Sequence, residues 1–566
     1  MIYHDVIIVG GGLAGLRAAV GLCEKYNVGL VSKVHPMRSH SIAAQVGINA
    51  SLANHPQSKD DSIEKHTFDT VKGSDYLADQ DAAELMCTEA PLVVYEMEHW
   101  GCPFSRFENG TIAQRPFGGA GYPRCCYSTD LTGHVLLNTL YERAVAKGVR
   151  VYSEYAVLSL VADEGACHGI IALDQINGEI VPMMSRATLF ATGGYGRVYW
   201  NSTNALINTG SGIGIAYAAG VPMKDMEFTQ FHPTSLLGTN ILMTEACRGE
   251  GGYLVNNQGE RFMQRYVPKA MELAPRDIVS RSIQTEIDEG RGFENEQGKY
   301  IHLDLRHLGA KKILEKLPGI RRISIDFYGV DPILEPIPIL PCMHYSMGGI
   351  DCNARCETSL KGFYAAGECS CNGVHGANRL GGNSLLETIV FGKVAARTMP
   401  DYLEGNGRQP NEKAVALKKQ EMEKRIVALG DGNEKPFKVI EELRKNMNDN
   451  VHIFRTKERL TTAVENIHRI KENYKGVRVF SADLHMNYEL LAALELEHMI
   501  DVSHAIALGA LLREESRGAH FRRDFAKRDD VNWLKHTLAT EDEKGEPVIS
   551  YKEVTITRYQ PMERTY

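Results

Sequence analysis

The sequence predicts an α/β fold of several domains, and three observations carry this prediction. Near the N-terminus, an apolar run, a glycine-rich turn and an Ala/Leu-rich segment follow one another, as in a βαβ unit. Residues 223–342 are richer in Pro, Arg and polar residues, with only short stretches of helical spacing. Residues 410–513 are rich in Lys, Glu and Leu at helical spacing, which predicts a helical domain.

The N-terminal segment predicts a dinucleotide-binding turn. Residues 5–9, DVIIV, form a continuous apolar run that is typical of a parallel strand buried on both faces. In the turn that follows, Gly10 permits a tight bend and Gly12 lets backbone N–H groups approach a pyrophosphate. Gly15 lets the next helix pack on the strand. The second strand ends in Ser32 and Lys33 rather than an acidic residue, which disfavours a nicotinamide cofactor.

Later segments return to the same pattern. GSGIGIAYAAG is expected to be a Gly/Ala-rich helix, and RATLFATGG to be a strand that ends in a glycine turn. GFYAAGE repeats that strand-then-glycine order near residue 362. The domain that begins with the N-terminal dinucleotide-binding turn is therefore predicted to be interrupted by an α+β capping domain. We predict two parts of the first domain (1–222 and 343–403), the capping domain (223–342), a bundle of about three helices (410–513) and a small C-terminal region (514–566).

Composition narrows the functional classes. The net charge of -8 disfavours a nucleic-acid partner, which would need clustered Lys and Arg. No apolar run reaches about 18 residues, and MIYHDVIIVGGG carries no basic leader, so we expect a cytoplasmic chain without a membrane span. The 12 cysteines show no CxxC spacing, so we expect free thiols and no metal site.

Histidine and arginine side chains recur in Gly/Pro-rich loops. They include His232 in FHPTS, Arg276 in ELAPRDIVSRS, and His344 and Arg379 further along the chain. Bidentate Arg and His donors suit the two ends of a small dicarboxylate. Taken singly, each residue also fits an ordinary structural role.

The motifs around these residues resemble those of the flavoprotein subunit of the succinate dehydrogenase/fumarate reductase family. The resemblance runs over nearly the whole chain, with long motifs in one order. These are RSH, TVKGSDYLADQDA, QRPFGG, QFHPT, TEACRGEGG, PRDIVSR, HYSMGGI, HGANRLGGNSL and ESRGAHFRRDF.

The resemblance implies a Rossmann-like FAD-binding domain and a set of site residues. His40 corresponds to the histidine that is covalently linked to the 8α carbon of the flavin. Arg276 corresponds to the proton-transfer arginine, with Glu245 and Arg248 as its relay. The implied dicarboxylate ligands are His232, Thr244, His344 and Arg379, with Phe117 packed against the substrate. The implied FAD contacts are Gly10, Gly12, Gly15, Ser32, Lys33, Ser39, Gly47, Ala156, Thr192, Gly193, Glu368, Ser384 and Leu385.

The same resemblance implies an activity and partners. Succinate and fumarate would be interconverted by hydride transfer to or from FAD. An iron–sulfur subunit would take the electrons toward a quinone, and membrane-anchor subunits would place the chain on the inner face of the cytoplasmic membrane. The helical region and RGAHFRRDFAKR, residues 517–528, are candidate docking surfaces.

Two departures and several alternatives stay open. The family often has Asp at Ser211, and the segment with Cys125 and Cys126 is expected to be a trimmed surface loop. An L-aspartate oxidase would typically lack a histidine at His40. A soluble or thiol-linked fumarate reductase is the nearer alternative. An FAD-dependent RNA-modifying protein would need a basic groove, and an electron-transfer scaffold would not need the His and Arg set.

Overall fold

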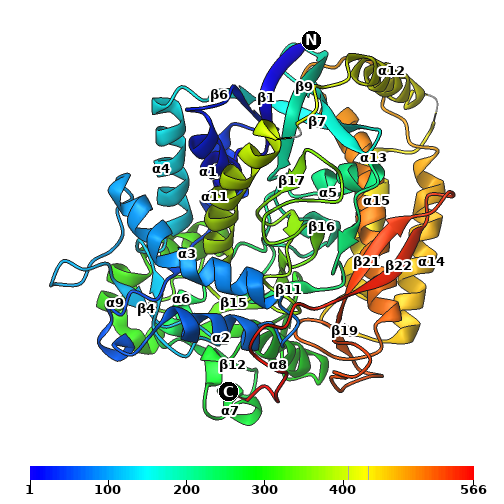
Figure 1. The fold of residues 1–566 in the computed structure, drawn as a ribbon. Coiled ribbons are helices and arrows are strands. Elements are labelled where there is room, and N and C mark those ends of the chain that lie inside the picture. Colours follow the sequence, from blue (N-terminus) through cyan, green and yellow to red (C-terminus); the bar gives the residue numbers. More distant parts are fainter. Residues whose placement is uncertain (406, 431, 566) are drawn as a thin grey trace.

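The largest sheet is built around the first strand and lies in the upper half of Figure 1. The computed structural model describes residues 1–405, 407–430 and 432–565. In it, β1 (Ile2–Val9) pairs in parallel with β2 (Val28–Ser32) and β9 (Glu179–Phe190). β17 (Phe363–Ala365) also pairs in parallel with β9. The chain therefore returns to its first sheet after the segment that was expected to interrupt it.

The same sheet is extended on both sides. β6 (Arg150–Ser153) joins β2 in parallel, whereas β7 (Tyr155–Asp163) and β8 (Ala166–Asp174) continue from β9 as antiparallel strands. β1 ends at Val9 and is followed by Gly10, whose φ of 116° is in the left-handed region. A side chain there would place its Cβ 2.1 Å from the carbonyl oxygen of Ala191. Only glycine therefore allows the close turn between β1 and α1 (Leu13–Leu22).

The inserted segment forms its own layer. β11 (Thr229–Leu236), β15 (Ile337–Ser346), β14 (Gly298–Asp304) and β12 (Tyr253–Val255) form an antiparallel sheet. α8 (Arg276–Asp288) packs on β11. One apolar core is made of buried residues between 236 and 339, so this layer buries its apolar side chains largely within itself.

The helical segment splits into two parts. α13 (Pro436–Asn450), α14 (Lys457–Tyr474) and α15 (Tyr488–Leu512) pack on one another, on the right of Figure 1. α12 (Glu412–Ala428) packs instead on β7, β8 and β9. Polar side chains cap three of these helices, because Asn411, Thr456 and Asn487 each accept a hydrogen bond from a backbone N–H of the first turn.

The C-terminal region ties these layers together. β21 (Lys535–Glu541) and β22 (Pro547–Glu553) form a hairpin beside α15. β21 also pairs with β10 (Met223–Lys224), which continues to β16 (Gly349–Asp351) and β18 (Ser370–Cys371).

The basic stretch 517–528 is only partly exposed, so its expected docking role is wrong for Arg517 and Arg522 and stays a prediction for the exposed Arg523 and Lys527. Arg517 and Arg522 are 1% and 0% exposed. Both side chains are held in ion pairs, with Glu515 and Asp524 respectively. Burial removes these charges from any surface that a partner could touch.

The expected surface loop at Cys125 and Cys126 is also wrong. The two residues form β5 (Cys125–Cys126), the central strand of a small sheet between β3 (Ile48–Asn49) and β4 (Gln114–Arg115). Both thiols are fully buried, and burial raises the pKa of Cys125 to about 12. These cysteines are therefore packing residues rather than reactive thiols.

The remaining elements surround these layers. They are α2 (Ile63–Gly73), α3 (Gln80–His99), α4 (Thr132–Ala146), α5 (Ser211–Ala218), α6 (Ala246–Gly249), α7 (Met263–Tyr266), α9 (Gly309–Lys316), α10 (Pro318–Tyr328), α11 (Asn383–Glu404), β13 (Phe293–Asn295), β19 (Phe454–Arg455) and β20 (Phe521–Arg522). α11 packs along α1. Within the described ranges, no helix is both long and apolar enough to cross a bilayer.

Candidate active site

A cavity of about 630 Å³ begins at the glycine-rich turn and reaches the inserted layer. Its volume is within the range of about 300–1,000 Å³ that small-molecule and cofactor sites span. The structure brings together in its lining most of the residues expected to hold a cofactor. They are Gly10, Gly12, Ser32, Lys33, Ser39, His40, Ala156, Thr192, Gly193, Glu368, Ser384 and Leu385.

Two of the expected cofactor residues lie outside this lining. A side chain at Gly15 would place its Cβ 1.9 Å from the carbonyl oxygen of Gly10, so Gly15 supports the turn from beneath. A side chain at Gly47 would meet the carbonyl oxygen of Cys126 at 2.4 Å. Gly47 therefore allows β5 to pack closely.

The cavity presents free polar groups that suit a dinucleotide. α1 begins after Gly12 at the cavity wall; Gly12 has no side chain to cap the helix, and the Ser41 hydroxyl accepts from the Leu13 N–H over a long 3.5 Å. A helix N-terminus favours a phosphate. The Thr192 hydroxyl and the Asn208 amide nitrogen are buried without a hydrogen-bond partner among the described residues. Buried polar atoms of this kind are normally satisfied, so a ligand is the natural partner here.

His40 faces the cavity with one ring nitrogen already engaged. The backbone N–H of Ala205 donates to His40 Nδ1 over 3.2 Å, and His40 Nε2 lies 3.4 Å from the Asn204 amide nitrogen. Burial and the nearby charge of Arg197 lower the pKa of His40 to about 4. The imidazole is therefore neutral at pH 7, and Nε2 has the longer and weaker contact of its two ring nitrogens.

The structure also explains the departure at Ser211. The Ser211 hydroxyl donates to Glu495 Oε1 over 3.3 Å, and the same carboxylate pairs with Lys33. Both Ser211 and Glu495 line the cavity. Glu495 comes from α15, so the helical segment supplies a carboxylate next to the position where the family often has Asp. Glu495 was not predicted because it lies far along the chain, in a helical region that was expected only as a docking surface.

Three buried nitrogens without partners among the described residues lie close to the far end of the cavity, and two of them, on His232 and Arg379, are outside its lining. Among the described residues, no hydrogen-bond partner lies within reach of Arg276 Nη2, Arg379 Nε or His232 Nε2, and all three atoms are buried. Arg276 and His344 also line the cavity, and the rings of His232 and His344 lie 5.0 Å apart. An unpaired buried donor is costly, so this group is arranged for an anion.

Gln230 links the two arginines and was not predicted. Its Oε1 accepts from Arg276 Nη1 over 3.3 Å and from Arg379 Nη2 over 2.8 Å. Its Nε2 donates to the backbone oxygen of Arg379 over 2.8 Å. Gln230 directly precedes the FHPTS motif, which is the signal that could have identified it.

Electrostatics at this end keep the histidines neutral. Burial, and then the charge of Arg276, holds the pKa of His232 and of His344 well below the usual range. Burial and Arg276 lower the pKa of Arg379 to about 9, although its guanidinium also lies 4.3 Å over the Tyr345 ring. The nearby Glu368 has a pKa raised by burial to about 7. The cationic arginines therefore dominate the field at this end.

The buried carboxylate of Glu245 lies between Arg276 and Arg248. Arg276 Nε donates to Glu245 Oε2 over 2.7 Å, and Arg248 Nη2 lies 3.7 Å from the same oxygen. The backbone N–H of Gly118 donates to Glu245 Oε1 over 2.7 Å. Burial opposes ionisation of Glu245, but the two arginines outweigh it and lower its pKa.

Thr244 and Phe117 lie close to this group but outside the cavity lining. The Thr244 hydroxyl accepts from the backbone N–H of Ala246 over 3.3 Å, and Phe117 packs with Val46 and Cys125. Thr244 precedes Glu245 in the chain, so its position helps to fix the start of α6.

Comparison with known proteins identifies the family. Residues 5–385 match the FAD binding domain family, and residues 440–566 match the fumarate reductase flavoprotein C-terminal family. The chain is 42% identical to the succinate dehydrogenase flavoprotein subunit of Rickettsia conorii, over 98% of this chain and 96% of that protein. The chain belongs to the succinate dehydrogenase/fumarate reductase flavoprotein family.

Other members of the family agree with this assignment. The fumarate reductase flavoprotein subunit of Escherichia coli is 42% identical, over 99% of this chain and 96% of that protein. A solved structure of E. coli quinol fumarate reductase FrdA superposes with a TM-score of 0.96 at 40% identity, covering 100% of this chain and 99% of that one. The predicted family, the interrupted Rossmann-like fold and the FAD cofactor are confirmed. The covalent bond at His40 stays a prediction.

Proposed function

We propose that the cavity holds FAD and that the donors at its far end bind succinate or fumarate for interconversion. The observation that carries this proposal is the set of three unpartnered buried donors on Arg276, Arg379 and His232. Two carboxylate groups supply the acceptors that these donors lack. The names of the relatives, which are succinate dehydrogenases and fumarate reductases, agree with a dicarboxylate ligand.

Positioning is the first contribution of these residues. Gln230 holds the side chains of Arg276 and Arg379 on one oxygen, so both guanidinium groups are fixed before a substrate enters. Neutral His232 and His344 can then act as hydrogen-bond donors without adding charge. Orientation of this kind can contribute about 7–11 kcal/mol in favourable cases.

Proton transfer is the second contribution. FAD, when bound, supplies the group that takes a hydride from succinate or gives one to fumarate. In fumarate reduction, Arg276 gives a proton to the other carbon; in succinate oxidation, it takes one. Because arginine normally stays protonated, Arg276 needs a route for exchange with solvent. Glu245 touches Arg276 at 2.7 Å and faces Arg248 at 3.7 Å, so it can pass the proton onward.

Replacing Arg276 tests the assigned role. In R276Q, succinate oxidation and fumarate reduction should both fall about 1,000-fold, since acid–base groups contribute about 10²–10⁴-fold. FAD content should stay at the wild-type level. The matched control is R281Q, one turn further along α8, where Arg281 pairs with Asp277 away from the cavity lining. Turnover of R276Q equal to that of R281Q would refute the role.

We propose further that His40 Nε2 is covalently bound to the flavin. The Nδ1 atom accepts from Ala205 N–H, so the uncharged ring carries its proton on Nε2, and that proton leaves when Nε2 bonds to the flavin. Denatured protein should therefore keep its flavin fluorescence on a gel. H40S should bind FAD without a covalent bond, keep some fumarate reduction and lose succinate oxidation. Free flavin released from denatured wild-type protein would overturn the linkage.

Electron transfer completes the proposal. We propose that an iron–sulfur subunit receives the electrons and that membrane-anchor subunits hold the assembly at the inner face of the cytoplasmic membrane. Structures with the titles Quinol-Fumarate Reductase with Menaquinol Molecules and Mycobacterium smegmatis Sdh1 in complex with UQ1 superpose with TM-scores of 0.95 and 0.87. Purification of the native assembly should recover iron, acid-labile sulfide and quinone-linked activity with this chain; a chain recovered alone from membranes and cytosol would contradict it.

A further inference from the structure

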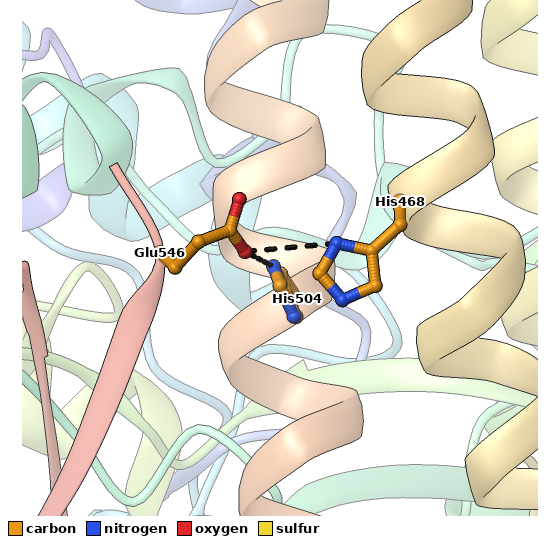
Figure 2. Close-up of side chains that lie close together, drawn as sticks. All are labelled: His468, His504 and Glu546. Atoms are coloured by element: carbon orange, nitrogen blue, oxygen red, sulfur yellow. Dashed lines mark ion pairs between the residues drawn. The ribbon is translucent and has the colours of Figure 1, made fainter. Parts of the chain in front are cut away.

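Two histidines and a glutamate from three different elements converge beside the C-terminal hairpin. His468 lies on α14, His504 on α15, and Glu546 at the residue before β22. Figure 2 shows both imidazoles turned toward the Glu546 carboxylate. His468 Nδ1 lies 3.6 Å and His504 Nδ1 3.5 Å from Glu546 Oε2, and the three ligand atoms all lie within 4.8 Å of one another.

These distances fit metal coordination better than hydrogen bonding. Glu546 Oε2 is buried and has no hydrogen-bond partner among the described residues. In a tetrahedral zinc site, metal–ligand bonds of about 2.0–2.2 Å place neighbouring ligand atoms about 3.3–3.6 Å apart. The two N–O separations lie at the upper end of that range. A metal ion between these three atoms would supply the partner that the buried carboxylate oxygen lacks.

An ordinary ion pair does not explain the cluster. The ring of His504 is 4% exposed, and its Nδ1 lies 3.5 Å from Glu546 Oε2, which is longer than a charge-assisted hydrogen bond. The charge of Glu546 is already met by Lys471, whose Nζ lies 3.0 Å from Oε1. Lys471 thereby holds the carboxylate so that Oε2 points at the histidines. This is the kind of outer support that orients a metal ligand.

We propose that His468, His504 and Glu546 form a binding site for a divalent transition-metal ion of the zinc type. Two imidazoles and one carboxylate are the donor set that zinc shares with nickel, cobalt and copper. The His468 side chain is 51% exposed, so the fourth position opens toward water.

The proposed metal site lies apart from the active site, and an ion bound there would affect the stability of the C-terminal hairpin. None of its three residues lines the FAD cavity. A bound ion would join α14, α15 and the β21–β22 hairpin at one point. It would therefore clamp the C-terminal hairpin onto the helical bundle, where no disulfide connects the described residues.

Metal titration of the FAD-loaded full chain tests the proposal. After treatment with a chelator, wild-type protein should bind one Zn²⁺ per chain in calorimetry with ZnCl₂. Loss of an outer-shell partner alone costs about 10–100-fold in metal affinity, so H468A and H504A should each bind Zn²⁺ about 100-fold more weakly or worse. Zn²⁺ should also slow hydrogen exchange in residues 535–553 of wild-type protein but not of H468A.

A surface histidine provides the matched control. His485 Nδ1 lies 2.7 Å from Asp483 Oδ1, and both side chains are more than half exposed, so H485A removes a His–carboxylate pair without a third ligand. It should bind Zn²⁺ as the wild type does. H468A changes an exposed residue and keeps the test valid if H504A fails to fold. Equal Zn²⁺ affinity of H468A and H485A, or no stoichiometric binding by wild-type protein, would overturn the proposal.

Discussion

Two groups of buried arginines in this protein have opposite surroundings. In the C-terminal group, Arg513 is 0% exposed and all of its donors are used, by Glu227, Glu515, Thr537 and two backbone oxygens. In the active-site group, Arg276 and Arg379 are equally buried, but each keeps a nitrogen without a partner.

The charges of the C-terminal group stabilise the fold, whereas those of the active-site group are arranged to bind a ligand. Opposite charges nearby raise the pKa of Arg513 despite its burial, whereas burial and a like charge lower that of Arg379 to about 9. A satisfied buried cation stabilises the fold only through its partners, and losing one partner is costly. An unsatisfied buried cation costs stability and is retained where it binds an anion.

The largest expected effect is on stability, at Arg513. Replacement by Gln leaves Glu227 and Glu515 buried without their cation. The free energy of unfolding should fall by about 3–5 kcal/mol, measured by denaturant titration. R523Q is the control, because the Arg523–Asp288 pair is exposed and should contribute about 1 kcal/mol or less. Equal losses in the two variants would remove the distinction between the groups.

Arg379 should show the reverse behaviour. In R379Q, kcat/KM for the dicarboxylate should fall about 100–1,000-fold, since truncating one partner of a buried charge pair costs about 2–5 kcal/mol. The free energy of unfolding without substrate should stay the same or rise, because a buried unpaired donor is removed. A large loss of stability with normal kcat/KM would assign Arg379 to the structural group.

His536 gives the paired region a pH dependence. Its Nδ1 lies 2.6 Å from Asp225 Oδ2 and its Nε2 3.2 Å from Asp79 Oδ1. Burial opposes its charge, but the carboxylates outweigh it and raise the pKa from 6.5 to about 9. This contribution of about 3 kcal/mol is fully present below about pH 6.5 and is lost as pH rises through about 9.

Urea unfolding at a series of pH values checks this expectation. The difference in unfolding free energy between wild type and H536N should shrink from pH 6.5 to pH 9.5. H485N, which changes an exposed histidine, should follow the wild-type profile. A constant difference between wild type and H536N across this range would contradict the assigned ion pair.

Gln230 should give the smallest effect. Q230A removes the acceptor shared by Arg276 and Arg379, so kcat/KM should fall about tenfold, or about 1.4 kcal/mol. Q284A is the control, because Gln284 lies on the exposed side of α8 and bonds Asp288. A Q230A enzyme with the kcat/KM of Q284A would show that the arginines need no help in positioning.

Much of the architecture follows from local patterns. The apolar run before Gly10 and the spacing to Gly12 predicted β1, the turn and α1, because these features depend on neighbouring residues alone. The Lys, Glu and Leu spacing of residues 410–513 likewise predicted helices, and Pro436 lies in the first turn of α13. Site residues inside long motifs, such as Arg276 and His344, were also identified, and the structure brings them to one cavity.

Contacts between distant segments were not predictable in this way. The role of Gln230 depends on two arginines from other segments, and Glu495 reaches the cavity from a helical region that was expected only as a docking surface. Arg517 and Arg522 looked like part of a basic surface, because a sequence shows charge but not burial. Cys125 and Cys126 were misread for the same reason.

The sequence by itself determined the family, the FAD-binding turn and the types of residue available for chemistry. Only the tertiary structure decided which of the buried charges are paired and which stay free, and which residues meet at His468. The physical reason is desolvation. A motif carries the same charge wherever it lies, but the surrounding chain decides whether burial leaves that charge a partner.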